Sequence, residues 1–574
     1  MKNIIVLFLL LLNSTTSLLS QTSKSDLDKI PVELVHINVN TKLAFAGEYL
    51  YYKFYCTLAD SKMLSSLSKV GYVDFINEDK KVVFQHKLIL EKGTAYSEFF
   101  IPADLPSGNY KLIGYTNWMR NFGANTFFNK DITILNPYLG NQTVFLEEDF
   151  KENLSRPISL VKISNGPGDE TISLGTDKAA YSKREKVNLN IESKLGKKIK
   201  GTYSLSVRKK TALDGSLENR ETLSKSNSAA NIKPISYRFL PESRGAFLSG
   251  SIRQQKGTIQ KLMISLPGKN NLFHVATTDN EGNFDIPLSA PYNNENIYII
   301  PFSDSNTAGE ISLKTMQNIE YGNLDFETFI LNESMKKLIL ERSIHNQIEN
   351  AFFDSKPDSL AQPKPFTPFY DGETTQYALD DYTRFSTLKE TFVEILKYVS
   401  IHKNSKGSTF FKVIPMLPLI DSGETSLVLL DGAYIHNHER LLEIPAKSIE
   451  KITIARDQYL YGSYSFQGIM DIRTFEGDAF KTYLDPQGQS FPQKQFRIKK
   501  NYYSEDYSGS KLELKRHIPD FRNQLAWIPE IKETKSTFNT SFYTSDVTGK
   551  FEITLEGISS EGIPIRIKES FTVK

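Results

Sequence analysis

The chain has 574 residues, and at about 100–150 residues per domain this length predicts several domains rather than one core. Its 69 basic and 67 acidic residues nearly cancel, to a net charge of +2, which argues against nucleic acid as a partner. Aromatic residues make up 12% of the chain, and with many Thr, Ile and Val they favour strands, so we expect a mainly β protein.

The first twenty residues have the features of an export signal. A lysine precedes an uninterrupted apolar run over residues 4–12, and small polar residues follow it. We therefore predict a signal peptide over residues 1–20. This run is too short to cross a bilayer as a helix, and no later stretch reaches about 18 uninterrupted apolar residues, so we expect no transmembrane segment.

Cys56 is the only cysteine, and it lies well beyond the predicted signal. An N-terminal lipid anchor would need a cysteine at the cleavage point, and an intrachain disulfide would need a second thiol. We therefore expect neither, and we interpret Cys56 as a small buried hydrophobe.

Short alternating runs between residues 31 and 137 predict a first β-sandwich. Asn77, Glu78 and Asp79 separate two strand-like halves, as expected of a hairpin. A Gly-Glu pair before "LYYK", with "SGNYKLIGYTNWMRNFG" further on, resembles the macroglobulin-type sandwich of bacterial secreted proteins.

Two further β units follow. The stretch "ETISLGTDKAAYSKREKVNLNIESK" resembles the next sandwich of such proteins, which predicts a second macroglobulin-like sandwich over 165–240. Residues 241–320, with the turn in "VATTDNEGNFDIPL", resemble a carboxypeptidase regulatory-like β domain. The oxygen-rich turn from Asp279 is not expected to bind calcium, because the twelfth position of an EF-hand loop, which needs glutamate, is Ala290.

Residues 328–400 are expected to hold two helical segments around a Pro-rich linker, the second leading into the next module. In the first, over 331–352, apolar residues including Ile344 and Ile348 lie near a helical stripe. In the second, Thr387 and Glu390 stand at capping-box spacing.

Residues 386–476 contain "SLVLLDGAYI", "SIEKITIARD" and "YLYGSYSFQGIMDIRT", in the order strand, turn, polar segment, strand, Gly-rich loop, strand. This stretch resembles the plug of TonB-dependent outer-membrane receptors. The matching positions are Asp431, Gly432, Ile449, Glu450, Ile452, Tyr461, Gly462, Ser463, Gly468, Ile469, Ile472 and Thr474. The resemblance implies a small α/β module at the outer membrane of a Gram-negative bacterium.

About a hundred residues follow this module, whereas a membrane barrel needs many segments of about 9–11 alternating residues, so we expect no barrel in this chain. Residues 520–574 again resemble a macroglobulin-type sandwich, so we expect a sandwich to be interrupted by, or to resume after, the plug-like insertion. The predicted fold class is mainly β, with tandem macroglobulin or immunoglobulin-like sandwiches and one small α/β plug-like module.

Motifs of common catalytic sites are missing from the sequence. There is no Cys-Gly-Glu-Gln thioester, Gly-x-Ser-x-Gly elbow, P-loop or His-Glu-x-x-His helix. We therefore predict no enzyme and no cofactor. His436 and His438, beside Glu439, could hold a metal ion, but a solvated loop explains the same residues and we assign no metal site.

Two groups of residues are candidates for binding. The first comprises the plug-like loops, with Asp431, Gly432, His436, His438, Tyr461, Gly462 and Gly468. The second is an aromatic loop with Trp118, Arg120 and Phe122, residue types that are common in recognition surfaces. The alternatives are that the glycines are structural and that the aromatic rings belong to the core of the first sandwich.

The leading hypothesis is a non-enzymatic binding or scaffold protein, exported to the periplasm or cell surface and held peripherally at the outer membrane. Its expected partner is an outer-membrane barrel or transporter complex. One alternative is a component of TonB-dependent uptake that binds a ligand or peptide directly through the plug-like loops. Another is an enzyme with an unfamiliar site.

Overall fold

The protein is described by a computed structural model. The residues described are 31–140, 172–194, 196, 198–214, 234–235, 238–253, 257–268, 271–288, 296–302, 309–314, 319–322, 324–361, 368–370, 372–404, 407–416, 424–461, 464–531 and 535–574. The predicted signal peptide over residues 1–20 lies outside them. Within these residues strands far outnumber helices, which confirms the mainly β fold class.

The first sandwich is built from eight strands in two sheets, ordered β1-β3-β6 and β2-β8-β7-β4-β5. The strands are β1 Glu33–Val39, β2 Leu43–Phe45, β3 Tyr49–Leu58, β4 Val70–Ile76, β5 Val82–Ile89, β6 Thr94–Phe100, β7 Gly108–Tyr115 and β8 Phe128–Leu135. The expected hairpin is β4–β5, closed where Asn77 N–H donates to the Lys81 carbonyl at 3.1 Å. Cys56 is buried as predicted, and burial raises the pKa of its thiol.

The second sandwich combines strands from two distant parts of the sequence. Its sheets are β10-β32-β31-β12-β29 and β30-β11-β9. The strands are β9 Ile172–Thr176, β10 Ala180–Tyr181, β11 Lys186–Ser193, β12 Gly201–Lys209, β29 Gln524–Ile531, β30 Thr537–Tyr543, β31 Gly549–Ser559 and β32 Pro564–Val573. Because β12 pairs with both β29 and β31, the C-terminal segment completes a sandwich that the insertion interrupts.

The third β unit also has two sheets, ordered β16-β13-β18 and β15-β14-β17-β27. Its strands are β13 Ala246–Ile252, β14 Lys261–Leu266, β15 Leu272–Thr277, β16 Asn283–Leu288, β17 Asn296–Phe302, β18 Ile311–Leu313 and, much later in the chain, β27 Gln489–Pro492. At the turn before β16, the Asp279 carboxylate accepts the backbone N–H groups of Glu281 and Asn283. These bonds are those of an ordinary polar turn.

Helix α4 (Lys336–Ala351) packs on the first sandwich through both apolar and polar side chains. Met335, Leu338 and Ile339 of the expected stripe pack on an apolar cluster, and Arg342 is buried. Ile344 departs from the expectation, because it is 47% exposed while the polar Ser343 and Asn346 are buried. The reason is the turn between β2 and β3. Its carbonyls accept hydrogen bonds from Asn346 and Asn350, and its Glu48 carboxylate is held bidentately by Arg342 at 2.8 and 2.6 Å.

The α/β module (residues 374–483) has one five-stranded sheet, ordered β20-β25-β26-β23-β24, and a hairpin β21–β22. The strands are β20 Thr374–Ala378, β21 Val399–Lys403, β22 Thr409–Val413, β23 Leu427–Leu430, β24 Ala433–Tyr434, β25 Ile449–Tyr461 and β26 Tyr464–Thr474, and the helices are α5 Leu388–Glu394 and α6 Phe480–Tyr483. The predicted capping box of Thr387 and Glu390 begins α5. The helix ends at Glu394, short of residue 400, where the run from Val399 forms β21 instead.

A return segment (residues 484–523) leads from the α/β module back to the second sandwich. It contributes β27 to the third β unit, and β28 (Lys500–Asn501) pairs with β19 (Ser359–Leu360) before the short helix α7 (Lys511–Leu514). Along the first sandwich, the buried Glu98 carboxylate contacts Arg497 at 3.2 Å, Lys500 at 2.8 Å and the Tyr502 hydroxyl at 2.7 Å. These contacts fix the segment to the sandwich.

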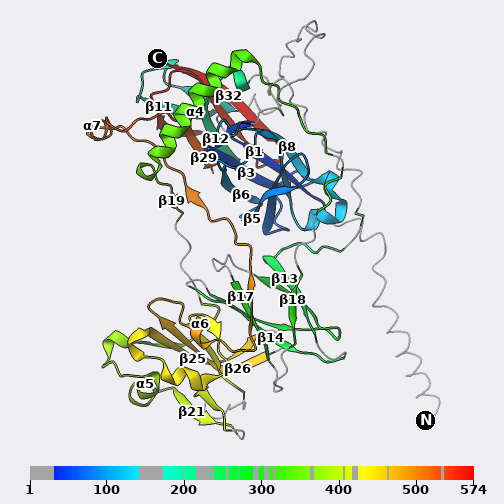
Figure 1. Cartoon of the computed structure of the whole chain (residues 1–574), viewed down its shortest axis with the longest axis vertical. Helices are drawn as coiled ribbons and strands as arrows, with labels where there is room; N and C mark the ends of the chain where they lie inside the picture. The colour runs from blue at the N-terminus through cyan, green and yellow to red at the C-terminus, as the bar shows by residue number, and fades with distance from the viewer. Residues whose placement is uncertain are drawn as a thin grey trace, which may run out of the picture.

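Figure 1 shows the resulting arrangement, with the two sandwiches and α4 at one end and the third β unit and the α/β module at the other. The first sandwich and the third β unit share one apolar core, to which Phe496 of the return segment belongs. Among the described residues, no helix is long and apolar enough to span a membrane.

Candidate binding site

Asp431 and Gly432 form the turn between β23 and β24 of the α/β module. Both have positive φ, 49° and 86°, which is typical of a tight turn. The buried Asp431 carboxylate accepts from the Thr474 N–H and hydroxyl, each at 2.8 Å, and from the Ala479 N–H at 3.0 Å. Asp431 therefore ties the end of β26 to the turn and has no free acceptor aimed at solvent.

Gly432 lies where the module meets the third β unit. A Cβ atom placed on it would come within 2.2 Å of the Asn271 Cβ atom. Beside it, Arg473 donates to the Asn271 side-chain oxygen at 2.7 Å, and the Gly268 N–H donates to the Asp431 carbonyl at 3.1 Å. The motif residues of this turn thus belong to an interface between two parts of the chain.

A shared apolar core extends this interface. It combines Met263, Phe273 and Ile300 of the third β unit with Leu429 and Ile469 of the module, among others. This packing covers one face of the module's sheet, while α5, α6 and the turns around 438–448 lie against the core of the other face. The module and the third β unit therefore hold together as one body.

Tyr461 and Gly468 also have structural contacts. The Tyr461 hydroxyl donates to the Phe273 carbonyl, and its ring lies 5.5 Å from the Phe273 ring. Gly468 has φ of 75°, and an added Cβ atom would lie 2.5 Å from a methyl carbon of Val413. Gly462 lies outside the described residues.

His436 and His438 do not converge. His436 is exposed, whereas His438 is buried and its Nδ1 accepts the Phe411 N–H at 2.8 Å. Burial lowers the pKa of His438 to about 3, so its imidazole is neutral. Among the described residues, no group of three His, Cys, Asp or Glu is placed to hold a metal ion.

The aromatic loop packs inward. Trp118 and Phe122 are each 4% exposed, and the Trp118 indole donates to the Pro31 carbonyl at 2.9 Å. The Arg120 guanidinium lies 3.9 Å from the centre of the Phe239 ring. Both aromatic rings are thus unavailable at the surface, which favours the alternative that they belong to the sandwich core and corrects the expectation of a recognition surface there.

The α/β module has exposed apolar side chains outside the core that it shares with the third β unit. Val393 on α5 is 75% exposed and Leu460, near the end of the β25–β26 hairpin, is 81% exposed. Tyr382, Ile414, Met416 and Phe475 are also exposed. We call these six residues the apolar surface of the module. Sequence reasoning missed it, because the resemblance drew attention to the loops that the third β unit covers.

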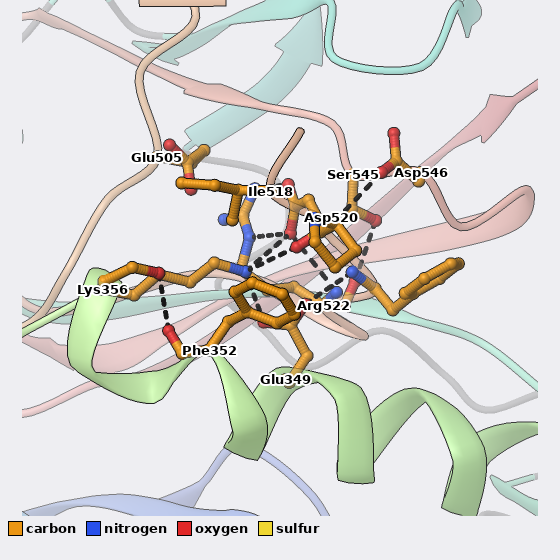
Figure 2. A network of polar contacts seen from close by, with 12 residues as sticks. Glu349, Phe352, Lys356, Glu505, Ile518, Asp520, Arg522, Ser545 and Asp546 are labelled. Atoms are coloured by element: carbon orange, nitrogen blue, oxygen red, sulfur yellow. Dashed lines mark hydrogen bonds and ion pairs between the residues drawn. The ribbon is translucent and has the colours of Figure 1, made fainter. Parts of the chain in front are cut away.

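A polar network fixes the point where the return segment enters the second sandwich (Figure 2). The buried Asp520 carboxylate holds Arg522 bidentately at 2.6 and 2.7 Å and also accepts the Tyr507 hydroxyl at 2.9 Å. Glu349 of α4 pairs with Lys356 at 2.7 Å and accepts the Phe521 N–H. The network therefore joins α4, the return segment and the second sandwich.

Two cavities lie between the sandwiches. One, of about 100 Å³, is lined mainly by polar and basic residues of β12, β31, β32 and the loop before β2. The other, of about 180 Å³, is lined by aromatic residues that include Tyr49, Tyr51, Tyr502 and Trp527. In the second, the Tyr51 ring already packs against those of Trp527 and Tyr502, with centres 5.9 and 5.0 Å apart.

Comparison with known proteins gives no family model and no curated protein that matches the chain. Among solved structures, Escherichia coli alpha-2-macroglobulin in its native conformation is 10% identical, with 94% of this chain and 40% of that one covered and a TM-score of 0.23. The Escherichia coli protein activated by porcine elastase is 9% identical, with 94% of this chain and 44% of that one covered and a TM-score of 0.24. Salmonella alpha-2-macroglobulin reacted with methylamine is 10% identical, with 94% of this chain and 23% of that one covered and a TM-score of 0.15. The chain spans less than half of each of these proteins, and the TM-scores are low, so these likenesses say nothing about its function.

Proposed function

We propose that the chain is a non-enzymatic binding or scaffold protein of the cell envelope, accessory to a larger outer-membrane barrel complex. The observation that carries this proposal is the α/β module, which is fixed to the third β unit through a shared core and has exposed apolar residues on its free surface. Apolar residues presented on a rigid body are typical of protein–protein contact sites.

The partner is proposed from the resemblance of residues 386–476 to a receptor plug. Plugs fold inside barrels, so a plug-like module on an exported scaffold is suited to dock at such a barrel. In this account the sandwiches, α4 and the return segment hold the module in place, and the protein is peripheral to the membrane.

The direct-uptake alternative has less support from the geometry. Its candidate loops include His436 and His438, but one imidazole is exposed and the other accepts a backbone hydrogen bond in the interior. We therefore propose docking by the module surface rather than capture of a small ligand by these loops.

The test is a mild-detergent pull-down of the tagged protein from its native envelope, with co-purifying proteins identified by mass spectrometry. The proposal expects a stoichiometric outer-membrane barrel protein with the native chain, and its loss with Val393→Glu or Leu460→Asp. Val82→Glu, at a residue 50% exposed on the first sandwich, is the matched control and should retain the partner. Recovery of the chain alone would overturn the proposal.

A further inference from the structure

The basic cavity between the two sandwiches has an excess of positive charge. Seven of its lining residues are lysine or arginine, and three are aspartate or glutamate. Two of the three carboxylates are engaged at short distance, since Glu552 contacts both Lys210 and Lys568 at 3.0 Å and Glu556 contacts Arg566 at 2.7 Å. The lining residues therefore carry an excess of positive charge, although Lys209 is paired with Glu341 outside the lining at 3.0 Å.

Arg208 is one of the cations that line this cavity. Its closest carboxylates lie at 3.7 Å, on Glu48, and at 3.9 Å, on Asp214. Glu48 is already held bidentately by Arg342, and Asp214 accepts the N–H and hydroxyl of Thr211. Burial, followed by the nearby Arg342 charge, lowers the pKa of Arg208 to about 10, as expected where a buried cation has too little negative charge beside it.

Two hydroxyl groups lie beside a lysine because of the strand register. Ser206 on β12 is opposite Thr554 on β31, which is opposite Lys568 on β32, so the three side chains form one row on the same face of the sheet. Lys42, on the loop of the first sandwich, lines the same cavity, and its ammonium group makes no ion pair with any described residue. Cationic groups and hydroxyls are the donors that oxyanions accept from.

The size of the cavity admits a small anion. A single water needs about 10–15 Å³ of cavity volume, so about 100 Å³ accommodates one tetrahedral oxyanion. We propose that this cavity is a binding site for one phosphate or sulfate group, either free or at the end of a larger molecule. Lys42, Arg208 and Thr554 would contact it, and its binding would join the first sandwich to the second.

The experiment is isothermal titration of the purified full chain with inorganic phosphate and with sulfate, against chloride at equal ionic strength. Saturable binding of phosphate or sulfate is expected, with Kd raised about tenfold in Lys42→Gln, because each such contact is charge-assisted. Thr554→Val, which keeps the shape and removes the hydroxyl, should also weaken binding. Lys81→Gln, at a lysine 78% exposed on the first sandwich, is the matched control and should bind as the native chain does.

Titration with glucose 6-phosphate distinguishes the two sources of the group. If glucose 6-phosphate binds more tightly than inorganic phosphate, the ligand is the terminal group of a larger molecule. If it binds more weakly, the ligand is the free ion. Heats no different from those of chloride would overturn the proposal. So would phosphate binding that Lys42→Gln and Thr554→Val leave unchanged while circular dichroism shows that both variants are folded.

Discussion

Gly432 of the α/β module lies directly against Asn271 of the third β unit, so close that a Cβ atom on the glycine would be 2.2 Å from the Asn271 Cβ atom. Asn271 cannot easily withdraw, because Arg473 donates to its side-chain oxygen. We predict that Gly432→Ala loosens the module and destabilises the chain by at least about 2 kcal/mol, from the positive φ together with the clash.

Gly407 is the matched control for this substitution. It has nearly the same φ, 84°, but no atom lies within 4 Å of an added Cβ. Gly407→Ala should therefore cost only the conformational part, about 1 kcal/mol. Equal losses in the two variants, measured by urea unfolding, would mean that the contact with Asn271 does not stabilise the interface.

His438 and His436 should respond differently to alanine. His438→Ala removes a buried acceptor from the Phe411 N–H and leaves a cavity, and we predict a loss of about 2–3 kcal/mol. His436→Ala changes an exposed side chain and should cost about 0.5 kcal/mol or less. Zinc titration of the native chain provides a second readout, and thermal stabilisation by zinc that both variants lose would restore the metal-site interpretation.

Glu242, at the junction between the first sandwich and the third β unit, makes the stability of the chain depend on pH. Burial raises the pKa of its carboxyl to about 7, although Lys87, Tyr72 and Arg120 lower it. The folded chain thus holds a proton that the unfolded chain releases near pH 4.5. This contribution to stability is full below the unfolded pKa and is lost as the pH rises toward and through about 7.

We therefore predict that the free energy of unfolding falls by about 1–3 kcal/mol between pH 4.5 and pH 7.5 through Glu242. Glu242→Gln keeps the acceptor for the Tyr72 hydroxyl and cannot ionise. Denaturant midpoints at several pH values should show a smaller decline in this variant than in the native chain. Parallel declines would assign the pH dependence to other groups.

Asp520→Asn should be among the more damaging single-atom changes in the chain. It leaves the buried Arg522 guanidinium without its bidentate partner, and breaking such a pair typically costs about 3–5 kcal/mol. The exposed Asp79, 3.7 Å from Lys81, provides the control, since Asp79→Asn should cost less than about 1 kcal/mol. Similar melting temperatures for the two variants would show that the network in Figure 2 adds little to stability.

Local features of the fold could be predicted from the sequence. The β4–β5 hairpin and the capping box of Thr387 and Glu390 depend on residues a few positions apart, and both are present. The turn at Asp431 and Gly432 was likewise recognisable from its residue types.

Contacts between distant residues could not be predicted in the same way. The predicted stripe of α4 packs through Met335, Leu338 and Ile339, but Ile344 is exposed. The rest of the helix packs on a turn whose carbonyls and carboxylate accept from Arg342, Asn346 and Asn350. Similarly, Gly432 was expected in a loop available for binding, and nothing near it in sequence indicated that Asn271 would cover it. The residues proposed for binding are therefore the exposed apolar side chains of the module and not the predicted loops.

The central claim is that the free surface of the α/β module docks on an outer-membrane partner. The most direct measurement is photo-crosslinking in the native envelope, with the crosslinking amino acid in place of Val393. A control variant has the same amino acid in place of Val82 on the first sandwich. We predict a crosslink from position 393 to an outer-membrane barrel protein, and none to that protein from position 82. No crosslink from 393, or the same products from both positions, would contradict it.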